Sequence, residues 1–167
     1  MVHVSQGTVA TDPDQLLRPT IEALRDEPVL VVACTARIDS FGAGLGTALP
    51  ANVRADRYVP YGALLPRVSV MVSNGGFNGV QAALAAGIPL VTAGSSEDKP
   101  EVCARLRRTG ASIDLATATP TPAQVRTAVR TLLSDPTYRQ AAQRLAAEMA
   151  AAGGAQRAAD LLEALLG

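Results

Sequence analysis

The glycine-rich segment Asn74–Gly79 carries the clearest chemistry in this sequence, because it joins an apolar run to a stretch of helical character. The first N–H groups of a helix have no partner within that helix, and the helix dipole favours negative charge beside them. Gly75 and Gly76 lack a Cβ that would hold a ligand away from the backbone. Asn74 and Asn78 add side-chain amide donors. The segment therefore predicts a phosphate-binding turn.

The elements around this turn alternate between apolar runs typical of buried strands and stretches typical of helices. We expect strands at Val2–Ser5, Val29–Thr35, Val53–Val59, Val68–Ser73, Ile88–Ala93 and Ala111–Leu115. We expect helices at Asp14–Asp26, Tyr61–Pro66, Asn78–Ala86, Pro100–Thr109, Thr121–Leu133, Asp135–Ala151 and Ala155–Leu166, the first of them capped by Asp12-Pro13. This alternation predicts an α/β fold, a doubly wound, Rossmann-like parallel sheet covered on both faces.

Ligands of such sheets bind beyond the carboxyl ends of the strands. Five loops are expected at that edge: Gly7-Thr8, Ala36-Arg37, Tyr58–Pro60, Asn74–Gly76 and Gly94–Lys99. The fold and the glycine-rich turn therefore predict the same crevice as the binding site.

The composition excludes several classes of function. Net charge is zero, which gives no electrostatic case for nucleic acid, and no apolar run reaches the roughly 20 residues that span a bilayer. His3 is the only histidine, so a zinc site or a Ser-His-Asp site within this chain is not expected. Cys34 and Cys103 form no metal-binding spacing and are expected as unreactive thiols in a reducing, cytoplasmic setting.

The segment Tyr58–Lys99 resembles the donor-binding signature of family 1 glycosyltransferases, which include UDP-glucuronosyl-, UDP-glucosyl- and bacterial natural-product transferases. The matching pieces, in order, are Tyr58-Val59-Pro60, Leu64-Leu65-Pro66, Asn74–Gly79, Ala86-Gly87-Ile88-Pro89 and Asp98-Lys99. The resemblance implies the C-terminal half of a GT-B fold, with residues 1–167 as a single nucleotide-sugar-binding domain. It also implies that the N-terminal acceptor domain, which holds the family's catalytic base, is absent from this chain.

The resemblance further implies roles for particular residues at the nucleotide end of the site. Tyr58 matches the aromatic residue that stacks on the base, and Val59 matches the residue whose backbone contacts the pyrimidine edge. The implied diphosphate site comprises Gly7, Thr8, Asn74, Gly75, Gly76, Asn78 and Gly79.

At the sugar end, Asp98 matches the aspartate that binds sugar hydroxyls, and Lys99 stands where glutamine is usual. Asn74 takes the place of a histidine, so the diphosphate charge must be met elsewhere, and Lys99 is one candidate. Ala82 stands where many members have a glutamate that binds the ribose, which favours a donor without a 2′-hydroxyl.

Structural roles remain open for three of these residues. Tyr58 could be an aromatic residue at the edge of the core, Asp98 could cap the following helix, and Lys99 could be a solvated loop residue.

These residues predict a donor-binding domain of an inverting transferase that moves a sugar from a UDP- or dTDP-sugar to a small hydroxylated acceptor. No cofactor or metal is expected, because N–H donors at a helix N-terminus can stabilise the charge of the leaving diphosphate. Two alternatives remain: a natural donor-binding subunit of a split transferase, and a non-catalytic sugar-nucleotide binder.

Overall fold

The computed structural model describes residues 1–7, 12–34 and 49–166. Its centre is a six-stranded sheet in which every pairing is parallel. The strands are β1 (Val2–Ser5), β2 (Val31–Cys34), β3 (Val53–Asp56), β4 (Val70–Ser73), β5 (Leu90–Thr92) and β6 (Ser112–Asp114). Their order, β3-β2-β1-β4-β5-β6, is the order of a Rossmann sheet, which confirms the predicted fold class.

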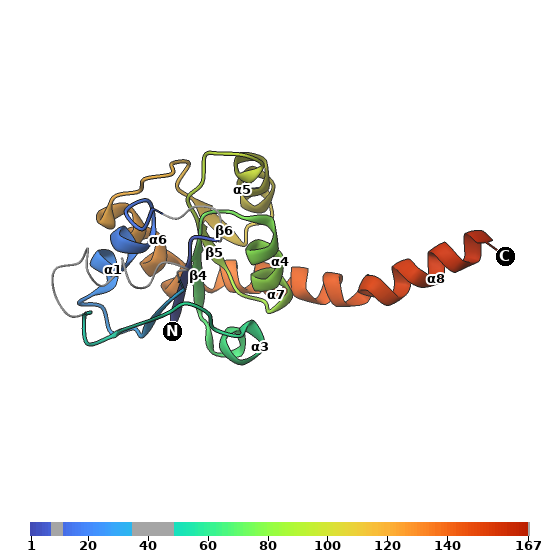
Figure 1. The fold of residues 1–167 in the computed structure, drawn as a ribbon, viewed down its shortest axis with the longest axis horizontal. Coiled ribbons are helices and arrows are strands. Elements are labelled where there is room, and N and C mark those ends of the chain that lie inside the picture. Colours follow the sequence, from blue (N-terminus) through green and yellow to red (C-terminus); the bar gives the residue numbers. More distant parts are fainter. Residues whose placement is uncertain (8–11, 35–48, 167) are drawn as a thin grey trace.

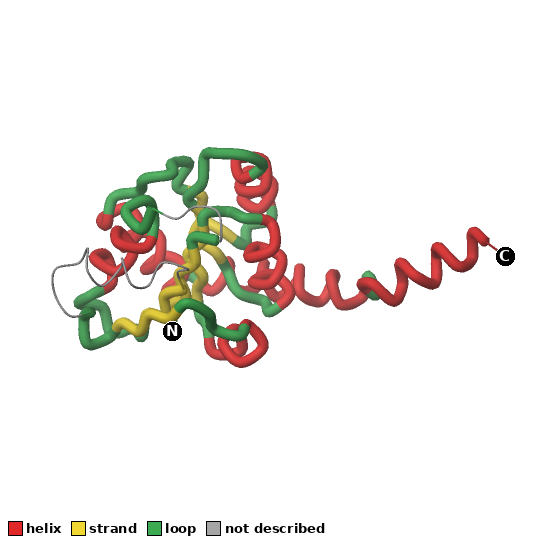
Figure 2. The backbone as a smooth tube through the Cα atoms, in the orientation of Figure 1, coloured by secondary structure: helices red, strands yellow, loops and turns green. Residues whose placement is uncertain are grey.

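Helices cover both faces of the sheet, as Figures 1 and 2 show. They are α1 (Leu17–Leu24), α3 (Tyr61–Leu64), α4 (Phe77–Ala85), α5 (Lys99–Arg108), α6 (Pro122–Ser134), α7 (Pro136–Ala151) and α8 (Gly154–Leu166), with a 3-10 helix at Leu65–Arg67. On one face α1 packs against α6, and on the other α4 packs against α7. The sheet is thus the middle of three layers.

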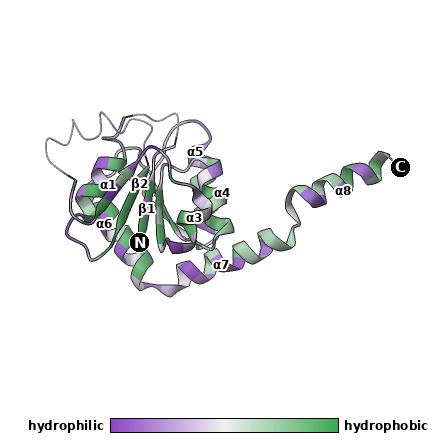
Figure 3. Ribbon diagram, turned by 60° about the horizontal axis from the view of Figure 1, so that its bottom comes forward, coloured by the Kyte–Doolittle hydropathy of each residue, from purple (hydrophilic) through white to green (hydrophobic). Residues whose placement is uncertain are grey.

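Each face of the sheet has its own apolar core, because successive side chains of a strand point to opposite faces. Val2 and Val4 of β1 join the core beneath α1 and α6, whereas Met71 of β4 joins the core beneath α4 and α7. Both cores consist mainly of aliphatic residues, and the central strands of the sheet are mainly hydrophobic in Figure 3.

The last helix, α8, extends away from this body (Figures 1 and 3). Leu161, Leu162 and Leu165 on it are 50%, 63% and 81% exposed. Within the described residues, none of the helices combines the length and the apolar character that crossing a membrane requires.

The strand ends align along one edge of the sheet. Ser5 pairs in register with Cys34 on one side and with Ser73 on the other. The chain winds outward in opposite directions from β1 and β4, so Ser5 and Ser73 mark the point where ligands bind in folds of this kind.

The observed elements follow the predicted order, with shorter strands and one misplaced helix start. Helix α1 begins at Leu17 rather than Asp14, and the predicted cap at Asp12 is wrong. Instead, the Gln6 side-chain oxygen accepts the N–H groups of Leu16 and Leu17, each at 3.2 Å. The Asp12 side chain accepts the Asp14 N–H at 3.0 Å, in the turn before the helix.

Gly94 fixes the distance between the ends of β4 and β5. A Cβ at this position would overlap the Asn74 carbonyl oxygen, and a backbone atom cannot move aside as a flexible side chain can. We predict that Gly94→Ala lowers the free energy of unfolding by more than about 2 kcal/mol, measured by denaturant titration. Gly62→Ala in α3, where a Cβ meets nothing within 4 Å, is the matched control. It should leave stability unchanged or raise it by up to about 1 kcal/mol, and equal losses in both variants would contradict this role of Gly94.

Candidate functional site

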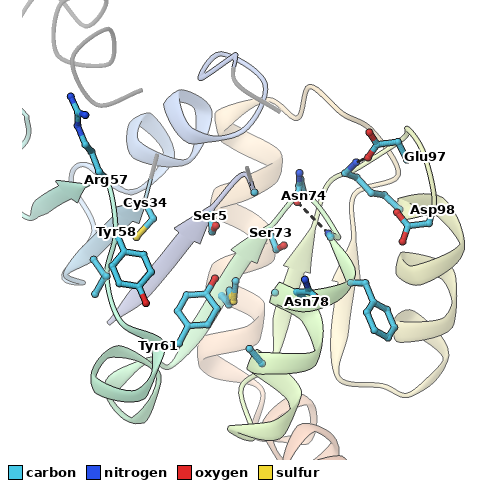
Figure 4. A pocket seen from close by; sticks show the side chains of 18 residues that line it. Ser5, Cys34, Arg57, Tyr58, Tyr61, Ser73, Asn74, Asn78, Glu97 and Asp98 are labelled. Carbon is cyan, nitrogen blue, oxygen red and sulfur yellow. Dashed lines mark hydrogen bonds and ion pairs between the residues drawn. The ribbon is translucent and has the colours of Figure 1, made fainter. Parts of the chain in front are cut away.

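A cavity of about 610 Å³ opens at the carboxyl edge of the sheet, above the ends of β1 and β4. Ser5, Ser73, Asn74 and Asn78 lie along its middle, as Figure 4 shows. The predicted crevice therefore exists.

The structure brings nearly all of the predicted site residues into this cavity. Those that line it are Gly7, Tyr58, Val59, Asn74, Gly76, Asn78, Gly79, Asp98 and Lys99. Gly75 packs behind the turn rather than lining the cavity. Thr8, Ala36 and Arg37 lie outside the described residues.

The Asn74 side chain holds the turn in shape. Its amide nitrogen donates to the Gln6 carbonyl oxygen at 2.5 Å, and its oxygen accepts the Gly76 N–H at 3.2 Å. The Ser73 hydroxyl accepts the Gly75 N–H at 3.2 Å. Two N–H groups that we expected to face a phosphate are thus already bonded within the turn. Asn74 as a diphosphate donor stays a prediction, and its observed role is to connect the ends of β1 and β4.

The two adjacent glycines of the turn are needed for different reasons. Gly75 has a φ of 82°, and a Cβ there would overlap the Cys103 sulfur of α5. Gly76 has an ordinary φ of −61°, and its Cβ would lie 3.4 Å from the Asn74 side-chain oxygen. The fold therefore requires Gly75, whereas Gly76 keeps the cavity open above the turn.

The first turn of α4 presents backbone N–H groups to the cavity. Gly76 is the N-cap, and no side chain in the described part of the chain caps this nine-residue helix. Phe77, Asn78 and Gly79 form its first turn and line the cavity. Their N–H groups have no partner within the helix, and the helix dipole adds partial positive charge. The N–H groups suited to an anion are therefore those one to three residues after Gly76, and their use by a ligand stays a prediction.

Aromatic residues form one end of the cavity. Tyr58 is 75% exposed, so the alternative that it belongs to the edge of the core is wrong. Tyr61 is half-buried and presents its ring edge-to-face to His3, with centroids 5.6 Å apart. Burial raises the pKa of Tyr61, and the nearby Ser5 side chain offsets part of that rise. Tyr58 and Tyr61 both point into the cavity in Figure 4.

The side chains of His3, Cys34 and Cys103 are uncharged and have structural roles. The buried His3 ring donates from Nδ1 to the Val32 carbonyl oxygen at 2.9 Å, and burial lowers its pKa, so it is neutral. Cys103 is buried and Cys34 half-buried, and both are free thiols. Burial raises the pKa of each thiol, which keeps it protonated and unreactive. Among the described residues, no three or more histidines, cysteines and carboxylates are placed to hold a metal ion.

Charged residues form the other end of the cavity. Asp98 is exposed at the N-cap position of α5, yet its side chain makes no capping hydrogen bond, so the capping role is wrong. Lys99 is the first residue of α5 and is 8% exposed, so it is not a solvated loop residue. Its ammonium group forms an ion pair with Glu97.

Eight further residues line the cavity and were not predicted as part of the site: Ser5, Cys34, Arg57, Tyr61, Met71, Ser73, Phe77 and Glu97. A signal existed for three of them, because Ser5 ends the first strand, Tyr61 follows Tyr58-Val59-Pro60, and Phe77 lies inside the glycine-rich turn. No signal in the sequence indicated Glu97, because its contact with Lys99 depends on the path of the loop that precedes α5.

Comparisons with known proteins agree with this geometry. Residues 26–165 match the family described as "Erythromycin biosynthesis protein CIII-like, C-terminal domain". The chain belongs to this family, which confirms the expected relationship to the C-terminal domain of GT-B glycosyltransferases.

Among its relatives, 4'-demethylrebeccamycin synthase of Lentzea aerocolonigenes is 47% identical over 99% of this chain. The solved structure of the kitacinnamycin glycosyltransferase is 31% identical over 97% of the chain, with a TM-score of 0.83. Spinosyn rhamnosyltransferase SpnG, solved in complex with thymidine diphosphate, is 28% identical over 90%, with a TM-score of 0.77. The chain spans only 38%, 42% and 41% of these three proteins.

We predict that Asn74→Asp destabilises the chain by about 1–3 kcal/mol, because a carboxylate cannot donate to the Gln6 carbonyl and leaves that oxygen facing a negative charge. Denaturant unfolding at neutral pH measures the loss. Asn78→Asp, an exposed change in the first turn of α4, is the control and should be neutral or slightly stabilising beside the helix N-terminus. Equal stabilities of the two variants would contradict the role of Asn74 in the turn.

Proposed function

We propose that this chain is the donor-binding domain of a glycosyltransferase and that its cavity holds a nucleoside diphosphate sugar. The observation that supports this most is the order of chemistry along one cavity. An aromatic end at Tyr58 and Tyr61 suits a base, the start of α4 suits a diphosphate, and the Asp98 end suits sugar hydroxyls. A nucleoside diphosphate sugar has a base, a diphosphate and a sugar in this same order.

In this proposal the base stacks on Tyr58 and its edge meets the backbone of Val59. The diphosphate accepts hydrogen bonds from the N–H groups of Phe77, Asn78 and Gly79. Gly7 lies beside the same turn, because a Cβ on it would be 3.3 Å from the Asn74 amide nitrogen. The Asp98 carboxylate accepts hydrogen bonds from hydroxyls of the sugar.

The proposed chemistry is sugar transfer with inversion to a small hydroxylated acceptor. As the bond between sugar and diphosphate breaks, negative charge grows on the diphosphate oxygen. N–H donors that are already positioned by the helix stabilise that charge without reorganisation. We infer that the donor site needs no resident cofactor or metal for this step.

The nucleotide is inferred to be UDP or dTDP. A related spinosyn rhamnosyltransferase was solved with thymidine diphosphate, and this supports a pyrimidine nucleotide here. Ala82 of α4 lines the cavity without a polar group for the ribose, which favours dTDP.

The acceptor and the catalytic base are proposed to lie in a separate, N-terminal acceptor domain of the whole protein. The relatives are longer than this chain, and several are named as transferases, which favours a transferase over a non-catalytic binder. The exposed leucines of α8 (Leu161, Leu162 and Leu165) would suit contact with such a domain.

We predict that Gly76→Val abolishes binding of UDP and dTDP while the fold survives. Position 76 has ordinary backbone angles and room for a Cβ, but the branched side chain would fill the space above the start of α4. Isothermal calorimetry measures binding, and circular dichroism checks folding. Gly62→Val in α3 is the control, and unchanged binding by the Gly76 variant would refute this location of the diphosphate.

We predict that Asp98→Ala weakens binding of UDP-glucose and dTDP-glucose more than binding of UDP and dTDP, because only the sugar contacts the carboxylate. Loss of one charge-assisted hydrogen bond should cost about tenfold in affinity. Glu101→Ala, an exposed carboxylate on the same helix, controls for the change in charge. Equal weakening for nucleotide and sugar nucleotide would remove Asp98 from the sugar site.

A further inference from the structure

Lys99 is the buried cation of the proposed donor site. It is the only lysine of the chain, and its side chain is 10% exposed. Its Cβ lies against the backbone of the turn, because a Cβ on Gly94 would be 3.1 Å from it and one on Gly75 would be 3.7 Å away. The Cβ end of the Lys99 side chain is therefore fixed beside the turn, and only the ammonium group can change its partners.

In the structure this ammonium group forms an ion pair with Glu97 and donates a hydrogen bond to the Ser96 hydroxyl at 3.5 Å. The Glu97 side chain is 56% exposed, so it can turn into water at little cost in solvation. Its φ of 58° holds the loop in the left-handed region, which brings a residue only two positions before Lys99 back toward it. An ammonium so deeply buried needs a negative partner, because an unpaired buried charge is strongly unfavourable.

The diphosphate in turn carries negative charge that a nearby cation would neutralise. The N–H groups of Gly75 and Gly76 and one amide hydrogen of Asn74 are already bonded, and the start of α4 offers partial charges only. Two lining residues carry a full positive charge, Arg57 beside Tyr58 and Lys99 beside the turn. Of the two, Lys99 has its Cβ packed against the turn that leads into α4.

We propose that the Glu97 carboxylate pairs with the Lys99 ammonium when no nucleotide is bound. When the nucleotide binds, a phosphate oxygen replaces the Glu97 carboxylate as the partner of the ammonium group. This rests on the proposed function. No covalent bond forms or breaks, and the ammonium keeps one anionic partner in both states. Glu97 then lowers the affinity for the nucleotide and helps to release the diphosphate product, because it competes for the same ammonium group.

Binding of UDP, dTDP and UDP-glucose to the 167-residue chain and its variants, measured by calorimetry, tests the exchange. Lys99→Met, which keeps the length of the buried stem, should weaken UDP and dTDP binding by about 10- to 100-fold. Glu97→Gln should tighten UDP and dTDP binding by about two- to fivefold, and this gain should vanish when Lys99→Met is also present. Glu101→Gln, which removes an equal charge outside the cavity, should leave binding unchanged.

Three results would overturn the proposal, and they differ from one another. If the unaltered chain binds none of the three ligands, the donor site itself is wrong. If Lys99→Met weakens UDP-glucose but not UDP, Lys99 serves the sugar and no exchange with the diphosphate occurs. If Glu97→Gln weakens UDP binding, or acts no differently from Glu101→Gln, Glu97 does not compete for the ammonium group. Glu97→Gln should not disturb folding, because this side chain is largely in solvent, so its effect on binding can be interpreted even if Lys99→Met fails to fold.

Discussion

The site depends on how Asn74 joins the ends of neighbouring strands. Its side chain bonds the Gln6 carbonyl after β1 and the Gly76 N–H before α4, while Gly94 after β5 presses against its carbonyl oxygen. A Cβ at Gly94 or a lost amide at Asn74 would change where α4 begins. We infer that contacts among these three strand ends set the position of the N–H groups at the start of α4.

This constraint also explains why the cavity has different chemistry at its two ends. One side of the turn faces β1, β2 and α3, where the Tyr61 ring packs edge-to-face against the His3 ring. The other side faces the start of α5, where Lys99 packs behind the glycines. A ligand that bridges these ends must pass over the N-terminus of α4, which is where we propose that the diphosphate lies between the base and the sugar.

The order of strands and helices was predictable, because apolar periodicity and glycine or proline punctuation are local signals. The cavity was predictable too, since topology sends all carboxyl ends to one edge. The start of α1 was not, because Gln6 caps it from ten and eleven residues away. The hydrogen-bonded state of the turn and the burial of Lys99 likewise depend on contacts made only after folding.

Amide NMR of the labelled chain during titration with UDP or dTDP tests the central claim most directly. The account predicts that the backbone N–H signals of Phe77, Asn78 and Gly79 shift most as the diphosphate binds, while the bonded Gly75 N–H shifts little. If those three signals stay in place while others report binding, the diphosphate lies elsewhere and the account is wrong.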